Sequence, residues 1–133
     1  MFQDFHELEY LDLSNVNTSK VKDMRCIFNE CYKLKEIKRK ENFNTNQVTN
    51  MEVMLQNCAE LEYLNLSNFN TSKDNDIGWM FNQCHKLKYL NISNFSLNND
   101  CLTTNIFHNI NKNECKIFIS GLNLNNLFQK KII

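Results

Sequence analysis

The sequence predicts an α/β solenoid with about 26 residues per repeat, a parallel sheet on one side and short helices on the other. Three observations lead to this prediction. Leucines recur at intervals of 26, 27 and 26 residues, at Leu8, Leu34, Leu61 and Leu87. Directly after each leucine, apolar and polar residues tend to alternate, which is the spacing of a strand. Later in each interval, apolar residues lie three or four positions apart, which is the spacing of a helix.

The fixed period divides the chain into units that we expect to stack as one repeat domain over residues 1–133. The units are a partial repeat (1–7), four repeats (8–33, 34–60, 61–86 and 87–113) and a degenerate terminal unit (114–133). A single unit offers too few apolar side chains to offset the conformational entropy that it loses on ordering. Neighbouring units are therefore expected to bury one another's apolar faces.

The strand of each unit is expected just after the recurring leucine. Leu11 and Leu13 alternate with polar residues, so these leucines should point into the core and their neighbours toward solvent. Stacked strands would then form two outward columns, which are Tyr10, Glu36, Tyr63, Tyr89 and Lys116, and Asp12, Lys38, Asn65, Asn91 and Phe118.

The second half of each unit has the pattern expected of a short amphipathic helix. Its apolar residues recur every three or four positions, as in Val21, Met24, Phe28, Cys31 and Leu34. An Asn-Thr-Ser segment before them has the composition of a turn and of a helix start. Each unit is therefore predicted to run strand, turn, short helix and return.

The second unit departs from the others. Lys38-Arg39-Lys40-Glu41 replaces the usual Leu-Ser-Asn and carries an insertion of one residue. The same unit holds a basic run, made of Lys33, Lys35, Lys38, Arg39 and Lys40. We interpret this run as a solvated turn; contact with an acidic partner or a phosphate is the alternative.

Composition excludes several classes of function. The chain has 15 basic and 15 acidic residues, so no overall field attracts nucleic acid or an anionic membrane. No apolar run approaches the roughly 20 residues that span a bilayer, so we expect no membrane insertion. The first residues lack the basic and apolar regions of a secretory signal, so the sequence alone leaves the cellular compartment open.

The sequence motif of the repeated unit resembles that of a known family. The segment from Leu61 to Ser72 reads LEYLNLSNFNTS, and Met80-Phe81 and Cys84 follow it. This is similar to the BspA-type leucine-rich repeat, also called the DUF285 or Mycoplasma-type surface-protein repeat, over nearly all of residues 1–112. The resemblance implies a leucine-rich-repeat-like α/β fold in proteins that are often secreted or on the cell surface. It also implies adhesion and binding of host or matrix proteins.

The cysteines that recur with the period are the first candidates for chemistry. Stacking should place Cys31, Cys58 and Cys84 in one column, where they could hold a metal or form a bridge. The column supplies no fourth ligand for zinc, so we interpret these residues as small buried hydrophobes. His85 follows Cys84 directly, and adjacent helical residues do not face each other. We therefore predict no catalytic residues, no metal site and no cofactor.

The outward strand positions are the strongest candidates for binding, and they are Tyr10, Asp12, Tyr63, Asn65, Tyr89 and Asn91. Tyrosine and asparagine on a rigid sheet suit recognition of a protein or a glycan. The alternative is tyrosine packing that only stabilises the sheet. The face offers only ~400 Å², about half of what one partner in a standard interface buries, so binding by one chain should be weak.

We therefore expect a non-enzymatic module of protein-binding or adhesion type that binds through the exposed strand face. The alternative is an intracellular structural or scaffold repeat, or a detached fragment of a longer repeat protein with no independent activity. The terminal edges of the stack invite edge-to-edge self-association. Residues 122–133 are expected either to cap the stack or to pair with another chain.

Overall fold

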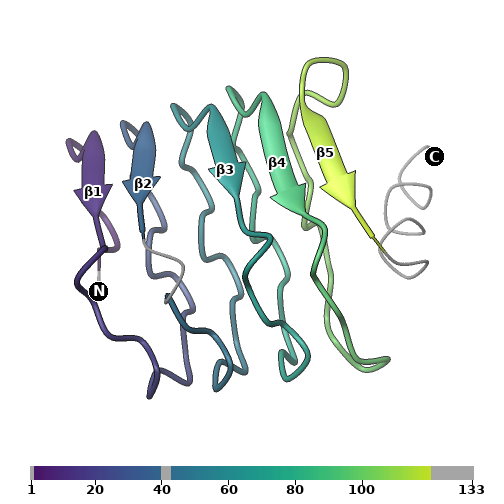
Figure 1. Cartoon of the computed structure of the whole chain (residues 1–133). Coiled ribbons are helices and arrows are strands. Elements are labelled where there is room, and N and C mark those ends of the chain that lie inside the picture. Colours follow the sequence, from purple (N-terminus) through teal and green to yellow (C-terminus); the bar gives the residue numbers. More distant parts are fainter. Residues whose placement is uncertain (1, 40–42, 121–133) are drawn as a thin grey trace.

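The fold was obtained as a computed structural model, which describes residues 2–39 and 43–120. Five short strands follow one another along the chain (Figure 1). They are β1 (Tyr10–Asp12), β2 (Glu36–Lys38), β3 (Tyr63–Asn65), β4 (Tyr89–Ile92) and β5 (Lys116–Ile119). Lys40 of the basic run, Glu41 and the predicted role of residues 122–133 lie outside the described residues.

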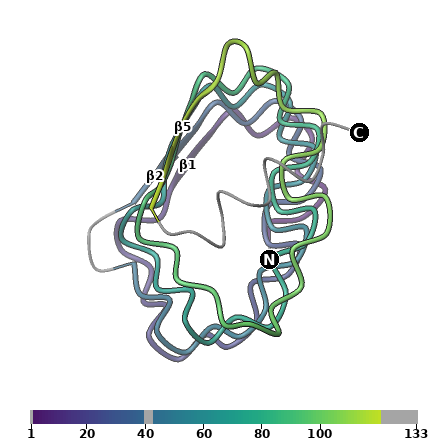
Figure 2. The ribbon, with the colours of Figure 1, turned by 90° about the vertical axis from the view of Figure 1, so that its right-hand side faces the viewer.

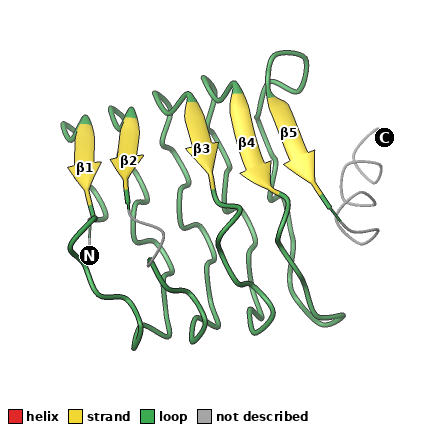
Figure 3. Ribbon diagram, in the orientation of Figure 1, coloured by secondary structure: helices red, strands yellow, loops and turns green. Residues whose placement is uncertain are grey.

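The predicted α/β solenoid, with a sheet on one side and short helices on the other, is wrong. The described residues contain no helix, and their strands form two small parallel sheets in the orders β1–β2 and β3–β4–β5 (Figure 3). The single continuous sheet expected from stacking is also incorrect, because β2 and β3 belong to different sheets. A leucine-rich-repeat-like architecture is therefore not supported.

The segment predicted as helix is a run of turns. Within the unit, the amide of Cys31 donates to the carbonyl O of Phe28 at 3.3 Å, and other amides make similar bonds to a carbonyl three residues back. The amides between them donate to carbonyls of the next unit instead: Phe28 N donates to Met54 O at 3.0 Å, and Glu30 N donates to Gln56 O at 2.9 Å. An α-helix requires each amide to bind the carbonyl four residues back. These amides hold neighbouring units together, so no helix forms.

Left-handed backbone explains how the apolar spacing arises without a helix. In residues 8–33, φ is 57° at Cys26 and 62° at Glu30. The same two phases are left-handed in later units, at Val53 and Asn57, Trp79 and Gln83, and Asn105 and Asn109. Such values are uncommon outside glycine and costly for a β-branched residue such as Val53. All of these residues lie within the run of turns, in which buried side chains recur every three or four residues without a helix.

The strand registers agree with the predicted columns. Tyr10 lies opposite Glu36 on β1 and β2, and Tyr63 lies opposite Tyr89 on β3 and β4. Lys116 of β5 continues this column beside Tyr89. A second line of parallel bridges runs without a break through all four repeats, at Asp23, Asn50, Asp76 and Leu102. The units therefore stay aligned where the sheet is interrupted.

The core lies between the strands and the run of turns on the opposite side of the outline (Figure 2). Its fully buried side chains include Phe28, Met54, Leu61, Phe81 and Leu90. Asparagines close the corners between these sides: the side-chain O of Asn17, Asn44 and Asn70 each accepts from the amide two residues on. This local bond suits a tight turn and gives a structural role to several of the 24 asparagines in the chain.

Candidate functional site

The outward strand face divides the six predicted binding residues between the two sheets. Tyr63, Asn65, Tyr89 and Asn91 lie side by side on β3 and β4. Tyr10 and Asp12 lie on β1, in the other sheet. The side chains of Tyr10 and Tyr63 are 62% and 59% exposed, whereas Tyr89 and Asn91 are half-buried. The structure thus brings together four of the six residues.

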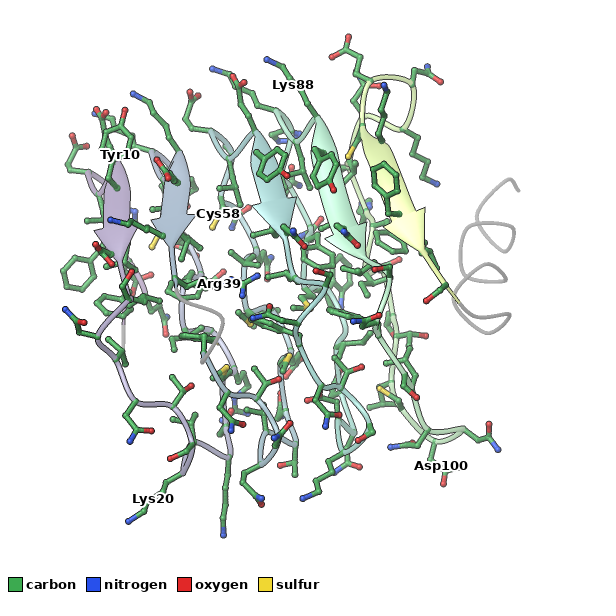
Figure 4. All side chains as sticks on the ribbon, in the orientation of Figure 1. Tyr10, Lys20, Arg39, Cys58, Lys88 and Asp100 are labelled. Atoms are coloured by element: carbon green, nitrogen blue, oxygen red, sulfur yellow. The ribbon has the colours of Figure 1, made fainter. Side chains whose placement is uncertain are left out.

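Three aromatic side chains, which we call the aromatic row, cross β3, β4 and β5: Tyr63, Tyr89 and Phe118 (Figure 4). The rings of Tyr63 and Tyr89 are stacked, with centroids 4.3 Å apart and 7° between their planes. Phe118 lies 5.1 Å from Tyr89 at a tilt of 42°. A hydrogen bond with the Tyr89 side chain, and then burial, raise the pKa of Tyr63. The distance between the stacked rings is close to the distance between neighbouring strands, so the ring planes stand roughly perpendicular to the sheet.

The polar residues of this face are partly committed to the backbone. The side-chain O of Asn65 accepts from Ser67 N at 3.0 Å, and that of Asn91 accepts from Ser93 N at 3.0 Å. Asp12 accepts from Ser14, and its bonds to Ser14 and then to Lys38 lower its pKa to about 2. Asp12 is therefore a charged turn residue, while the NH₂ group of Asn91 donates to the Tyr89 hydroxyl at 3.5 Å.

A groove of about 910 Å³ lies where the two sheets part, between β2 and β3. Tyr63 at the end of the aromatic row forms part of its wall, and Glu36 and Lys38 of β2 face it. The groove is lined by Lys35, Glu36, Ile37, Lys38, Arg39, Glu62, Tyr63, Leu64, Asn65, Ser67 and Asn68. Its walls therefore present one aromatic ring together with positively and negatively charged side chains.

Arg39 lies directly after β2, where the sheet is interrupted. By its place in the unit it corresponds to Leu13 and Leu66, which are buried core residues. Its guanidinium instead lies 5.1 Å from the ring of Phe69 and donates to the carbonyl O of Asn65 and to the side chain of Asn68. Burial lowers the pKa of Arg39. A side-chain bond thus reaches Asn65 from β2 at the point where the two sheets are not paired.

The groove was missed by sequence reasoning because one continuous sheet was expected. The signal was present, since an arginine at a core leucine position and an inserted residue mark one place in the period. Lysine side chains in the rest of the basic run take part in ion pairs, which the interpretation as a solvated turn did not include. Three exposed ion pairs join it to the preceding units: Lys33 to Glu7 at 2.6 Å, Lys35 to Glu9 at 2.7 Å and Lys38 to Asp12 at 3.3 Å.

The recurring cysteines form the predicted buried column and all six cysteines of the chain are free thiols. Cys58 Sγ donates to Phe28 O at 3.2 Å, and Cys84 Sγ donates to Leu55 O at 3.3 Å. Burial raises the pKa of Cys84 to about 12. Nucleophilic or metal-binding thiolates are therefore disfavoured in this column.

Within residues 2–39 and 43–120, no helix has the length and apolar character needed to cross a bilayer.

Comparison with known protein families gave a match over most of the chain. Residues 1–119 match the model of a family described as "Mycoplasma protein of unknown function, DUF285". Neither the search of curated proteins nor the search of solved structures returned a match.

Proposed function

The chain belongs to the DUF285 family, as the resemblance of its repeats predicted, and from this premise we propose that it is a protein-binding module of adhesion type. The family description states no function, so the proposal rests on the geometry of the strand face. The binding surface consists of the aromatic row and the adjoining groove. The module binds a partner and catalyses no reaction.

The exposed aromatic row is the observation that carries this proposal. Tyr63 is 59% exposed and Phe118 is 47% exposed, although both are large and apolar. Aromatic side chains offer a large contact area and lose little conformational entropy on binding, which makes them frequent centres of protein interfaces. The parallel strands beneath hold the row in place before a partner arrives.

The orientation of the rings favours a polypeptide over a glycan. Tyr63 and Tyr89 each cover one face of the other, so a partner above the strand face meets mainly ring edges and hydroxyl groups. A sugar ring stacks best on an open aromatic face lying flat in the surface, which this pair does not offer. The adjoining groove has room for a side chain of a partner, with Glu36 and Lys38 available on its other wall.

Binding by one chain is expected to be weak. The strand face offers roughly 400 Å², against about 800 Å² for one side of a standard interface. Several copies presented together would gain avidity without any new contact. We place this activity at a cell surface or in a secreted protein, which is the setting that multivalent adhesion requires.

A second function is favoured by the stacking itself. Two tyrosine rings in parallel contact at 4.3 Å stabilise neighbouring strands whether or not a partner binds. In that case the chain is a structural or scaffold repeat, and the aromatic row holds its units together.

A multivalent binding assay tests the proposal. The chain is coupled in many copies to beads and presented to immobilised extracellular-matrix and cell-surface proteins. The variant Tyr63→Ser/Phe118→Ser should lose the binding of the wild type by at least about tenfold, which is the effect of removing a binding hot spot. Tyr32→Ser is the matched control, since Tyr32 is 40% exposed but belongs to the run of turns.

Two results would count against the proposal. One is no binding by the wild type to any protein of the panel. The other is equal loss in the strand-face variant and in Tyr32→Ser. If the strand-face variant instead unfolds more easily and no binding is found, the structural role is favoured.

A further inference from the structure

Three side chains with metal-binding groups meet away from the strand face. Asp4 and His6 belong to the partial repeat, and Glu30 belongs to the run of turns in the next unit. One ligand atom from each residue, an imidazole nitrogen and two carboxylate oxygens, lies within 4.8 Å of the others. Asp4 and His6 are exposed and Glu30 is half-buried, so an ion can reach them from solvent.

His6 is already oriented. Its Nδ1 lies 3.0 Å from the carbonyl O of Glu30, and its ring is stacked on Tyr32 with centroids 5.1 Å apart. A carbonyl oxygen only accepts hydrogen bonds, so Nδ1 is the donor and the lone pair of the neutral ring is on Nε2. A histidine whose other ring nitrogen donates to a backbone carbonyl is the usual arrangement at metal sites.

The two carboxylates are held together by the period of the chain. Asp4 and Glu30 occupy the same phase of neighbouring units, and both have left-handed backbone, with φ of 64° and 62°. The amide of Asp4 donates to Asn29 O at 3.0 Å and fixes the partial repeat against the next unit. The cluster therefore brings two carboxylates beside one imidazole, a combination of charge and ligand atoms that favours a cation.

We propose that Asp4, His6 and Glu30 form a binding site for a divalent transition-metal ion such as Zn²⁺ or Co²⁺. One imidazole nitrogen with two carboxylate oxygens suits such ions better than an all-oxygen set, and three protein ligands leave a position for water. The ion would link the partial repeat to the following unit. The site is independent of the strand face and of the function proposed for it.

The sequence predicted no metal site, because the three residues are not close in sequence. A usable signal was the shared phase of Asp4 and Glu30, which places them on adjacent units. The same reasoning supplies an internal control. His85 has the phase of His6, but the position equivalent to Asp4 in its unit is Gln83, and the next is Asn109. Neutral amides there should not hold an ion.

Titration with Co²⁺ tests the proposal on the whole chain, by calorimetry and by visible absorption. We expect one equivalent to bind, with ligand-field bands and without the intense charge-transfer band of cobalt–thiolate bonds. His6→Ala, Asp4→Asn and Glu30→Gln should each weaken binding by at least about tenfold. His85→Ala should bind as the wild type does, and circular dichroism checks that all four variants are folded.

Three results would overturn the proposal: no binding by the wild type, a thiolate charge-transfer band as the only signal, or equal binding by the wild type and Glu30→Gln. A second readout concerns the link between units. Co²⁺ should raise the melting temperature of the wild type and of His85→Ala, and should raise that of His6→Ala clearly less. An equal rise in His6→Ala would show that the ion binds elsewhere.

Discussion

The ring of Tyr63 lies parallel to the ring of Tyr89, 4.3 Å away between centroids, at opposed positions of β3 and β4. Because the two rings contact each other directly, their contributions to stability should be coupled. We predict a coupling energy of about 0.5–1.5 kcal/mol in a double-mutant cycle of Tyr63→Ala and Tyr89→Ala. Urea unfolding of the wild type, both single variants and the double variant measures it.

The double replacement of Tyr63 and Tyr89 by Ser should leave the chain folded. Tyr63 is mostly exposed, and the strands beneath are held by Leu64 and Leu90, which lie in the core. The far-ultraviolet circular dichroism spectrum should therefore match that of the wild type. Loss of the spectrum would mean that the aromatic row belongs to the core, and would remove the basis of the proposed binding face.

Phe81→Ala should destabilise the chain by roughly 3–5 kcal/mol, as truncation of a large buried side chain does. Phe81 is fully buried, and its ring is stacked on Phe107 with centroids 6.1 Å apart. Chemical unfolding measures the loss. Phe118→Ala is the matched control, because Phe118 is 47% exposed and should cost much less. A loss below about 1 kcal/mol for Phe81→Ala would contradict its place in the core.

Cys58 and Cys84 should be unreactive in the folded chain. Each is fully buried, and burial raises the pKa of both thiols. Labelling with a thiol reagent at pH 8, followed by mass spectrometry, should modify the half-buried Cys26 before Cys58 and Cys84. Cys58 and Cys84 should be modified only at the rate of unfolding. Native labelling of Cys84 as fast as that of Cys26 would show that the column is open to solvent.

The columns of the structure could be predicted from the sequence, while the path of the chain between them could not. A fixed period places Tyr63 opposite Tyr89 in any stack of parallel strands, whatever joins the strands. The helices were predicted wrongly because spacing of three or four residues does not distinguish a helix from a run of turns. The difference lies in the amide of Phe28, which donates to Met54 O in the next unit. Such a bond between units leaves no mark on apolar spacing.

The positions with left-handed backbone could not be predicted from the sequence either. Cys26, Val53 and Trp79 occupy the same position of successive units and have a positive φ, yet none is a residue type that favours this conformation. The groove lay closer to prediction, since Arg39 at a leucine position was visible as a departure from the repeat. The sequence alone did not show that the guanidinium contacts the carbonyl of Asn65, or that the sheet is divided between β2 and β3.

Asp74 leads to the last prediction, which concerns pH. It occupies the phase of Val21 and Val48: the amide of each of the three residues donates at 3.0 Å to the carbonyl O of a threonine three residues earlier. Its side chain is fully buried, and neither carboxylate oxygen accepts a hydrogen bond from the described residues. Burial raises its pKa from 3.8 to about 7. The neutral acid is therefore the form that the fold prefers.

The sign of the pH dependence follows. Below pH 4 Asp74 is protonated in both the folded and the unfolded chain and has no effect on their balance. Between pH 4 and 7 the unfolded chain loses this proton more readily, so the free energy of unfolding falls as pH rises, by at most about 4 kcal/mol. Above pH 7 the loss is complete.

Asp74→Val should remove this slope and raise stability at pH 8, because valine matches Val48 in the same buried position. Urea unfolding of both proteins from pH 4 to pH 8 measures the difference, and taking that difference cancels titrating groups that the two proteins share, such as Asp12. The neighbouring Cys101 thiol, whose pKa burial and then Asp74 raise to about 11, stays protonated throughout this range. Parallel curves for the wild type and Asp74→Val would show that the carboxylate is hydrated in solution.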